Sequence, residues 1–168
     1  MKHLNLILII LILSCCPLHP AYAFFDKDIR LLTMRDGLAD NTIPCIYKDE
    51  DGFMWFGTDD GLSRYDGKTI QNFKPADTYA SVAAIVRLSD DFLGIVSDGY
   101  LYYFNRKQET FLPIHTESDT AIGVFNVLPA DNSSFWGISG NRLILCQWEI
   151  RQGKEEEKTA VRVRIQKT

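Results

Sequence analysis

Acidic side chains form the densest group of potentially reactive residues in this sequence. They are Asp49, Glu50, Asp51, Asp59, Asp60 and Asp66. Clustered carboxylates are typical ligands of Ca²⁺, but the EF-hand spacing fails here. Counted from Asp49, Phe53 falls on the third ligand position, and the required glycine comes two residues early, at Gly52. We therefore expect these aspartates to form turns, and we expect no metal site and no cofactor.

Residues 24–168 contain few side chains that could act in nucleophilic catalysis. Their histidine is His115, and their cysteines are Cys45 and Cys146. His115 follows Leu112-Pro113-Ile114 and is expected to be a solvated loop residue. The cysteines lie in apolar runs and are expected to be buried small hydrophobes rather than a disulfide. The sequence therefore predicts no catalytic residue and no enzyme activity.

The first 23 residues, 1–23, have the pattern of a secretory signal peptide. A basic start is followed by an apolar run of about ten residues, where a membrane-spanning helix needs about 20. Ala21-Tyr22-Ala23 then forms a small-residue cleavage site. Cleavage after Ala23 competes with a second interpretation, in which Ile12-Leu13-Ser14-Cys15 is a loose lipoprotein box and Cys15 is lipidated. Both interpretations predict an exported protein, and the second tethers it to a membrane.

Residues 24–168 are expected to fold, because the composition is that of a globular protein. Of all 168 residues, 46% are hydrophobic and 24% are charged, and the formal net charge is −4. Disordered and collagen-like classes have other compositions. A nucleic-acid interface needs a basic patch, so we expect no nucleic acid as a partner of this segment.

Three successive stretches share one pattern, with blade-like repeats at about 32–76, 80–116 and 121–166. Two independent landmarks keep the same spacing: Ile46, Ile85 and Val127 lie 39 and 42 residues apart, and so do Leu62, Leu101 and Leu143. Self-similarity with a period of about 40 residues is typical of stacked repeat architectures.

Each repeat is expected to consist of short strands. Aromatic and β-branched runs alternate with turn residues, and Asp-Gly, which favours tight hairpins, occurs five times. In the first repeat the expected strands are Ile43–Tyr47, Phe53–Thr58, Leu62–Tyr65 and Thr69–Phe73. Four short strands per period of about 40 residues are typical of a β-propeller blade. The predicted fold is all-β: a partial β-propeller at 24–168, with about three to three and a half four-stranded antiparallel blades. The charged run Arg151–Lys158 is expected to be a hairpin loop.

One continuous run also carries a family resemblance. Asp36-Gly37-Leu38 is followed by Asp49-x-Asp-Gly-Phe-Met-Trp-Phe-Gly-Thr-x-Asp-Gly-Leu-Ser-Arg-Tyr-Asp-Gly, which ends at Gly67, and then by Phe73. From about Leu32 to Phe73 this run resembles the two-component regulator propeller repeat, and the later repeats match it in outline. The motif positions expected to shape the repeat are Asp49, Asp51, Gly52, Trp55, Gly57, Thr58, Gly61, Leu62, Tyr65, Asp66 and Gly67.

The resemblance implies a periplasmic sensor segment. Propellers of this family are typically seven-bladed and belong to membrane-tethered, hybrid two-component sensors, which detect oligosaccharides and regulate transcription. It implies further blades, a membrane helix and a histidine kinase along a full-length chain, so that kinase activity would belong to a region absent here. The implied partners are an oligosaccharide, those further blades and the kinase; a homodimer is also allowed.

Tyr100, Tyr102 and Tyr103 depart from the corresponding residues of the first repeat. We expect one of them to be exposed and to contact the ligand, while most other aromatic residues form core between blades. Two alternatives stay open. One is a secreted or lipid-anchored propeller hydrolase or lyase that acts on polysaccharide through paired carboxylates. The other is a truncated remnant without activity.

Overall fold

The computed structural model describes residues 29–74, 81–116, 123–131, 133–151 and 160–166. The chain divides into two compact units, Met1–Leu31 and Leu32–Thr168, and every described strand belongs to the second. The predicted signal peptide and Cys15 lie outside the described residues. Within those residues, no helix combines the length and the hydropathy of a membrane span.

The first sheet of the unit Leu32–Thr168 is formed by four antiparallel strands in chain order. They are β1 (Cys45–Lys48), β2 (Met54–Thr58), β3 (Gly61–Tyr65) and β4 (Ile70–Phe73). These are the strands expected from the sequence, with ends shifted by up to two residues. Asp59 and Asp60 form the two-residue loop between β2 and β3, since Thr58 pairs with Gly61. At that pairing Gly61 has a φ of 119°, a left-handed conformation that favours glycine.

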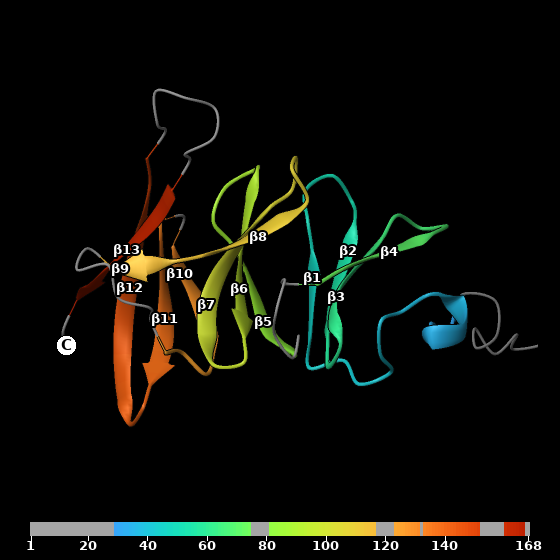
Figure 1. Ribbon diagram of the computed structural model, residues 1–168, viewed down its shortest axis with the longest axis horizontal. Coiled ribbons are helices and arrows are strands. Elements are labelled where there is room, and N and C mark those ends of the chain that lie inside the picture. Colours follow the sequence, from blue (N-terminus) through green and yellow to red (C-terminus); the bar gives the residue numbers. More distant parts are fainter. Residues whose placement is uncertain (1–28, 75–80, 117–122, 132, 152–159, 167–168) are drawn as a thin grey trace, which may run out of the picture. The chain divides into compact units, whose positions relative to one another are not determined.

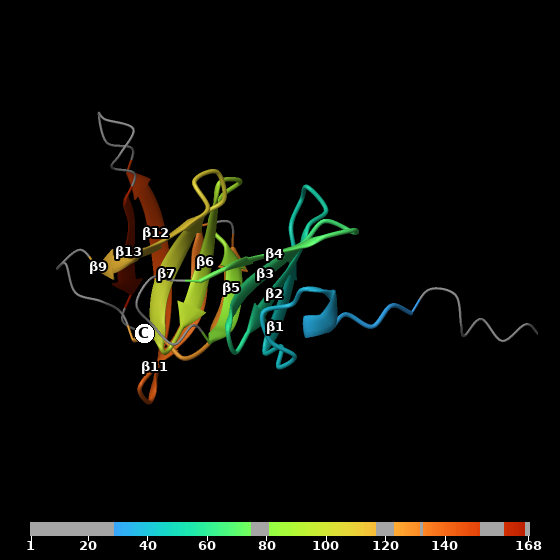
Figure 2. The same cartoon turned by 45° about the vertical axis from the view of Figure 1, so that its right-hand side comes forward.

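The second sheet lies beside the first, and the third lies beside the second, as Figures 1 and 2 show. The second contains β5 (Val82–Arg87), β6 (Phe92–Ser97), β7 (Tyr100–Asn105) and β8 (Thr110–Pro113), again in chain order and antiparallel. The third contains β10 (Val127–Asp131), β11 (Ser134–Ser139), β12 (Arg142–Arg151) and β13 (Ala160–Gln166). β12 and β13 pair antiparallel, as the predicted hairpin requires. Residues 152–159 of its loop lie outside the described residues.

A fifth strand joins the third sheet and corrects one expectation. β9 (His115–Thr116) follows the second sheet in the chain and pairs parallel with β13. His115, expected in a loop, therefore has its backbone in a strand. The reason is that the outer edge of β13 presents backbone groups that an adjoining segment can pair with.

The strand register confirms that the repeats are equivalent. The landmark residues form the pairs Ile46–Phe56, Ile85–Ile95 and Val127–Gly137. Each partner lies two residues before the residue that closes the next hairpin, which is Thr58, Ser97 or Ser139. The spacing of 39 and 42 residues is therefore that of matching positions in matching strands. The ends of the repeats stay predictions, because the links between sheets include residues that are not described.

The apolar core forms two layers between neighbouring sheets. Trp55, Leu62 and Phe73 of the first sheet pack against Leu93, Ile95 and Phe104 of the second. A second cluster joins residues of the second sheet, such as Leu101, to residues of the third, such as Phe135. Burial at a repeat position depends on the covering sheet: Leu62 and Leu101 are 0% and 2% exposed, whereas Leu143 is 57% exposed.

The segment before β1 covers part of the free face of the first sheet. Its 3-10 helix η1 (Met34–Asp36) is closed by a capping box with Thr33. The Ala39 N–H donates to Ser63 Oγ at 3.1 Å, and Asn72 Nδ2 donates to the Gly37 carbonyl at 2.8 Å. These bonds hold the segment against β3 and β4.

The two cysteines of the folded unit are free thiols in different sheets. Burial raises the pKa of Cys45 and of Cys146 to about 11 in each case. Because the thiolate is the nucleophile, we expect both to react slowly with iodoacetamide in mildly alkaline buffer and quickly once urea unfolds the chain. Mass spectrometry of the alkylated protein measures this. Fast labelling of the folded chain, or a bridged peptide without reductant, would contradict it.

Candidate functional site

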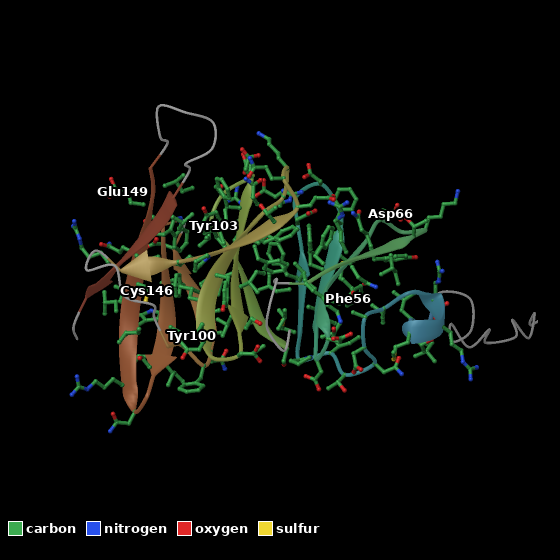
Figure 3. All side chains as sticks on the ribbon, viewed as in Figure 1. Phe56, Asp66, Tyr100, Tyr103, Cys146 and Glu149 are labelled. Atoms are coloured by element: carbon green, nitrogen blue, oxygen red, sulfur yellow. The ribbon has the colours of Figure 1, made fainter. Side chains whose placement is uncertain are left out.

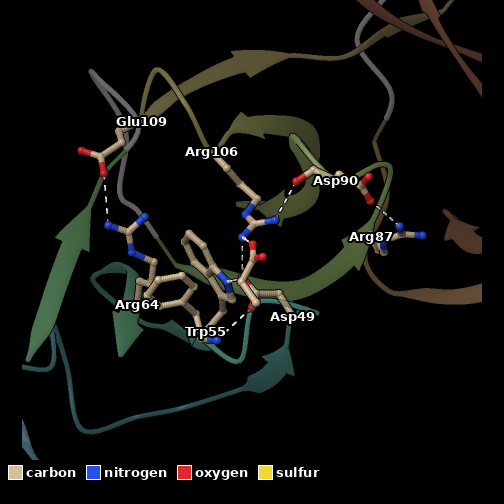
Figure 4. A network of polar contacts seen from close by, with 9 residues as sticks. Asp49, Trp55, Arg64, Arg87, Asp90, Arg106 and Glu109 are labelled. Atoms are coloured by element: carbon tan, nitrogen blue, oxygen red, sulfur yellow. Dashed lines mark hydrogen bonds and ion pairs between the residues drawn. The ribbon is translucent and has the colours of Figure 1, made fainter. Parts of the chain in front are cut away.

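A polar pocket of about 440 Å³ lies at one end of the interface between the first two sheets. Three turns surround it: the β1–β2 turn with Asp49–Asp51, the β5–β6 turn with Ser89–Asp91, and the start of the β7–β8 turn at Arg106 and Lys107. Figure 4 shows the polar contacts there. Unlike the apolar layer beside it, this end of the interface is rich in charge.

Asp49 is fixed by the turn that it starts. Its N–H donates to the Phe53 carbonyl at 3.0 Å, and its Oδ1 accepts the Phe53 N–H at 2.8 Å. Gly52 closes this turn with a φ of 92°, which favours glycine. Asp49 Oδ2 then accepts the indole N–H of Trp55 at 2.8 Å. The local sequence thus places a carboxylate, 2% exposed, at the bottom of the pocket.

Arg106 crosses from the second sheet to that carboxylate. Its Nη2 donates to Asp49 Oδ2 at 2.9 Å and also to Asp51, while its Nη1 donates to the Asp90 carbonyl at 2.6 Å. A buried ion pair is unfavourable unless hydrogen bonds satisfy both partners. Here Trp55 and the Asp90 carbonyl supply such bonds, and the guanidinium ties the two sheets together.

Arg64 makes a second bridge between the sheets. Its guanidinium lies 5.2–5.5 Å from the ring centroids of Phe53, Trp55 and Phe73, a cation–π geometry. Its Nη2 also donates to Glu109 Oε1 of the β7–β8 turn at 3.2 Å.

Ion pairs line the rim of the pocket. Arg87 Nη2 lies 2.6 Å from Asp90 Oδ1 and 3.3 Å from Glu50 Oε1, and Lys107 Nζ lies 2.9 Å from Asp91 Oδ2. The hydrogen bond with Asp90 raises the pKa of Arg87. Burial raises the pKa of Tyr47, which lines the wall, against the opposing charge of Arg87.

In the described part of the chain, no group of His, Cys, Asp and Glu side chains has the arrangement of a metal site.

The motif residues singled out from the sequence all lie in the first sheet and its turns. Beyond Asp49, Asp51, Gly52 and Trp55, the Thr58 hydroxyl donates to the Gly61 carbonyl at 2.9 Å. The Tyr65 hydroxyl donates to the Gly67 carbonyl at 2.6 Å. Gly57 and Leu62 face the second sheet, where Leu62 is fully buried and Gly57 approaches Val82.

The three candidate tyrosines do not share a surface. Tyr100 is 50% exposed, whereas Tyr103 is 4% exposed and lies edge-on to Phe92 with centroids 5.5 Å apart. Figure 3 shows Tyr100 and Tyr103 at different levels of the second sheet. Tyr102 packs against the core between the first two sheets. Tyr100 is at the β6–β7 hairpin, the opposite end of β7 from the pocket, and its contact with a ligand stays a prediction.

The cationic half of the pocket was missed by sequence reasoning. Arg87, Arg106 and Lys107 belong to no motif, and only their complementarity to the acidic turn distinguishes them. That complementarity becomes visible once neighbouring turns are known to meet.

Asp66 gives a prediction about acid stability. Hydrogen bonds from the Thr69 N–H and hydroxyl, and from the Lys68 N–H, hold the pKa of Asp66 at about 2, below its ordinary value of 3.8. A lowered pKa contributes stability above the ordinary value, and the contribution is lost as the pH falls towards 2. We expect NMR titration to show this pKa, and Asp66→Asn to remove that part of the pH dependence of unfolding. Titration of Asp66 near 3.8 would contradict it.

Residues 37–60, from the segment before β1 to the β2–β3 loop, match the two component regulator propeller family. The match covers β1, β2 and the turn between them. The turn at Asp49 and Gly52, together with Trp55, lies within the matched residues. No match to a curated protein was found.

Two solved structures from B. thetaiotaomicron resemble the chain. One is the extracellular domain of BT3049, named as a hybrid two component system: 18% identity, a TM-score of 0.58, and coverage of 70% of this chain and 18% of that one. The other is the extracellular domain of BT4673, named as a one component system: 20% identity, a TM-score of 0.52, and coverage of 71% of this chain and 15% of that one. These likenesses confirm the all-β propeller fold. The chain spans less than a fifth of the length of either structure.

Proposed function

We propose that the chain forms the first blades of an exported sensor propeller in a two-component system. It binds an oligosaccharide and regulates transcription through a kinase that lies further along a full-length protein. The segment itself binds and does not catalyse. The observation that carries this proposal is the two component regulator propeller repeat at residues 37–60, set within a series of four-stranded sheets.

The free face of the third sheet supports the presence of further blades. Leu128, Ile138 and Leu143 are exposed there. Leu143 occupies the position of Leu62 and Leu101, which neighbouring sheets bury. An apolar face of this kind on a soluble protein marks an interaction surface. Its residues match those that the inner sheets use to pack against the next sheet, so the next sheet is the occupant that fits them.

Signalling would result from a change in how the parts of the sensor are arranged. A ligand shifts such an equilibrium only by the difference in its affinity for the two states. A site that contacts more than one blade has that difference available. The protein is periplasmic in this proposal, and it is tethered through the full-length sensor or through lipid at Cys15.

Two measurements test the proposal. The reading frame beyond codon 168 should continue into more repeats, a membrane helix and a kinase; an immediate stop codon would contradict the sensor and favour the truncated remnant. Incubation of the chain with oligosaccharides should show binding and unchanged substrate by mass spectrometry. Cleavage products that disappear when a carboxylate pair is replaced would identify a hydrolase or lyase instead.

A further inference from the structure

We propose that the polar pocket between the first two sheets binds a neutral, polyhydroxylated ligand, namely one or two sugar units of an uncharged oligosaccharide. The inference rests on the proposed function, since it locates the ligand of that sensor. It moves the expected contact from the tyrosines of β7 to the turns that hold Asp49, Asp90 and Arg106.

The pocket has the size of a ligand site. Its volume of about 440 Å³ lies within the range of about 300–1,000 Å³ that is typical of small-molecule sites. The half-buried ring of Tyr47 contributes apolar surface for the C–H face of a sugar ring. Asp49 and Arg106 are the least exposed charged side chains of the pocket and are fixed by their own hydrogen bonds, so its polar end is preformed.

The charges of the pocket select the chemistry of the ligand. Five carboxylates (Asp49, Glu50, Asp51, Asp90 and Asp91) and four cations (Arg64, Arg87, Arg106 and Lys107) line it. Each of these cations already pairs with a carboxylate. An anionic ligand would have to displace those partners and would meet the excess of negative charge.

Hydroxyl groups avoid that conflict. A paired carboxylate keeps lone pairs that accept further donors, and a guanidinium offers five N–H groups in all. A sugar hydroxyl both donates and accepts, so it can bridge a carboxylate and a guanidinium without separating them. The carboxylates of Glu50 and Asp90 pair with Arg87 and still expose oxygen atoms to the pocket. Ion pairs of this kind can bind the hydroxyl groups of a polyol better than they can bind a charged group.

The walls of the pocket come from two different sheets. Asp49, Glu50 and Asp51 belong to the first sheet, and Asp90 and Arg106 to the second. A ligand in the pocket therefore contacts both sheets and stabilises the arrangement in which the two walls fit it. Differential affinity of this kind is what a sensor needs to convert binding into a structural change.

The test is calorimetric titration of the chain with three sets of oligosaccharides matched in length: neutral glucans and xylans, acidic oligogalacturonates, and cationic chitosan fragments. NMR of the labelled chain locates the bound sugar. We expect a neutral sugar to bind, amides of the β1–β2 and β5–β6 turns to shift, and Glu50→Gln and Asp90→Asn each to weaken binding about tenfold, through the loss of a hydrogen bond to a charged group.

Matched controls separate the site from the wider proposal. Asp59→Asn changes an exposed aspartate in the β2–β3 loop at the other end of the first sheet, and Tyr100→Ala changes the alternative contact; neither should alter binding. Loss of affinity in Tyr100→Ala alone would overturn the pocket and leave the sensor proposal standing. Preference for the acidic or cationic set would overturn the stated chemistry. Absence of binding by any set would overturn the pocket, and a full-length sensor that also fails to respond to them would overturn the oligosaccharide as its signal.

Discussion

Trp55→Ala is expected to lower the free energy of unfolding by about 3–5 kcal/mol, the range for removal of a buried large aromatic side chain. Trp55 is fully buried between the first two sheets, with ring centroids 6.0 Å from Phe73 and 5.6 Å from Phe104. The change also removes the indole N–H that donates to Asp49. The expected loss therefore combines a cavity in the core with the loss of one of the hydrogen bonds that hold Asp49 in its ion pair with Arg106. Urea unfolding followed by circular dichroism measures it.

Trp136→Ala is the matched control, because both tryptophans lie three residues before the residue that closes their hairpin. Trp136 faces the uncovered side of the third sheet, opposite the exposed Leu128, and it is only half-buried. Its loss should cost less than half as much. Equal losses would show that the burial of Trp55 by the second sheet is not the source of its contribution.

Much of the fold can be predicted from the sequence because local signals agree there. Asp66 and Gly67 turn the chain between β3 and β4, and the two short strands on either side pair antiparallel as in a hairpin. The intervals of 39 and 42 residues between Ile46, Ile85 and Val127 recur between Leu62, Leu101 and Leu143, and they identify the repeat even where the motif fades. The turn signal depends on neighbouring residues and the repeat signal on spacing along the chain, so both can be read without tertiary information.

The site depends on contacts that cross between sheets. Arg106 and Asp49 meet because two turns, far apart in the chain, close the same end of an interface. No residue near Arg106 indicates that partner. The placement of the tyrosines, by contrast, follows from strand geometry alone. Adjacent residues of a strand point to opposite faces of a sheet, so Tyr102 and Tyr103 face different core layers.

Three glycines lie inside corresponding strands, β2, β6 and β11, but at different registers. Gly57 lies one residue before the end of its hairpin strand, Gly137 two and Gly94 three. Gly94 stands where the first sheet has Trp55, with Tyr103 opposite it. Each glycine therefore has different neighbouring atoms, and alanine at each position is expected to change the free energy of unfolding by a different amount.

Gly57→Ala is expected to destabilise the fold by about 1–3 kcal/mol, the range for overpacking of a core. A Cβ at Gly57 would overlap Cys45 Sγ and would lie 2.6 Å from the Val82 carbonyl oxygen. The sulfur can turn away, but the carbonyl belongs to the backbone of β5 and cannot move without the second sheet. The expected strain therefore acts on the interface itself. Urea unfolding measures the loss.

Gly137→Ala is the matched control in the third sheet. There a Cβ would lie 3.0 Å from Val124 Cγ1, a side-chain atom that can shift by a few tenths of an ångström. Alanine also restricts the unfolded chain, which stabilises by about 0.4–1 kcal/mol at compatible positions, so this variant should be close to neutral. The double variant Cys45→Ala/Gly57→Ala separates the contact with Cys45 from the contacts with Val82, which are its carbonyl oxygen and its Cγ1. Full recovery relative to Cys45→Ala would mean that the sulfur alone opposes the new methyl group; persistence of the loss would identify Val82 as the residue whose approach requires glycine.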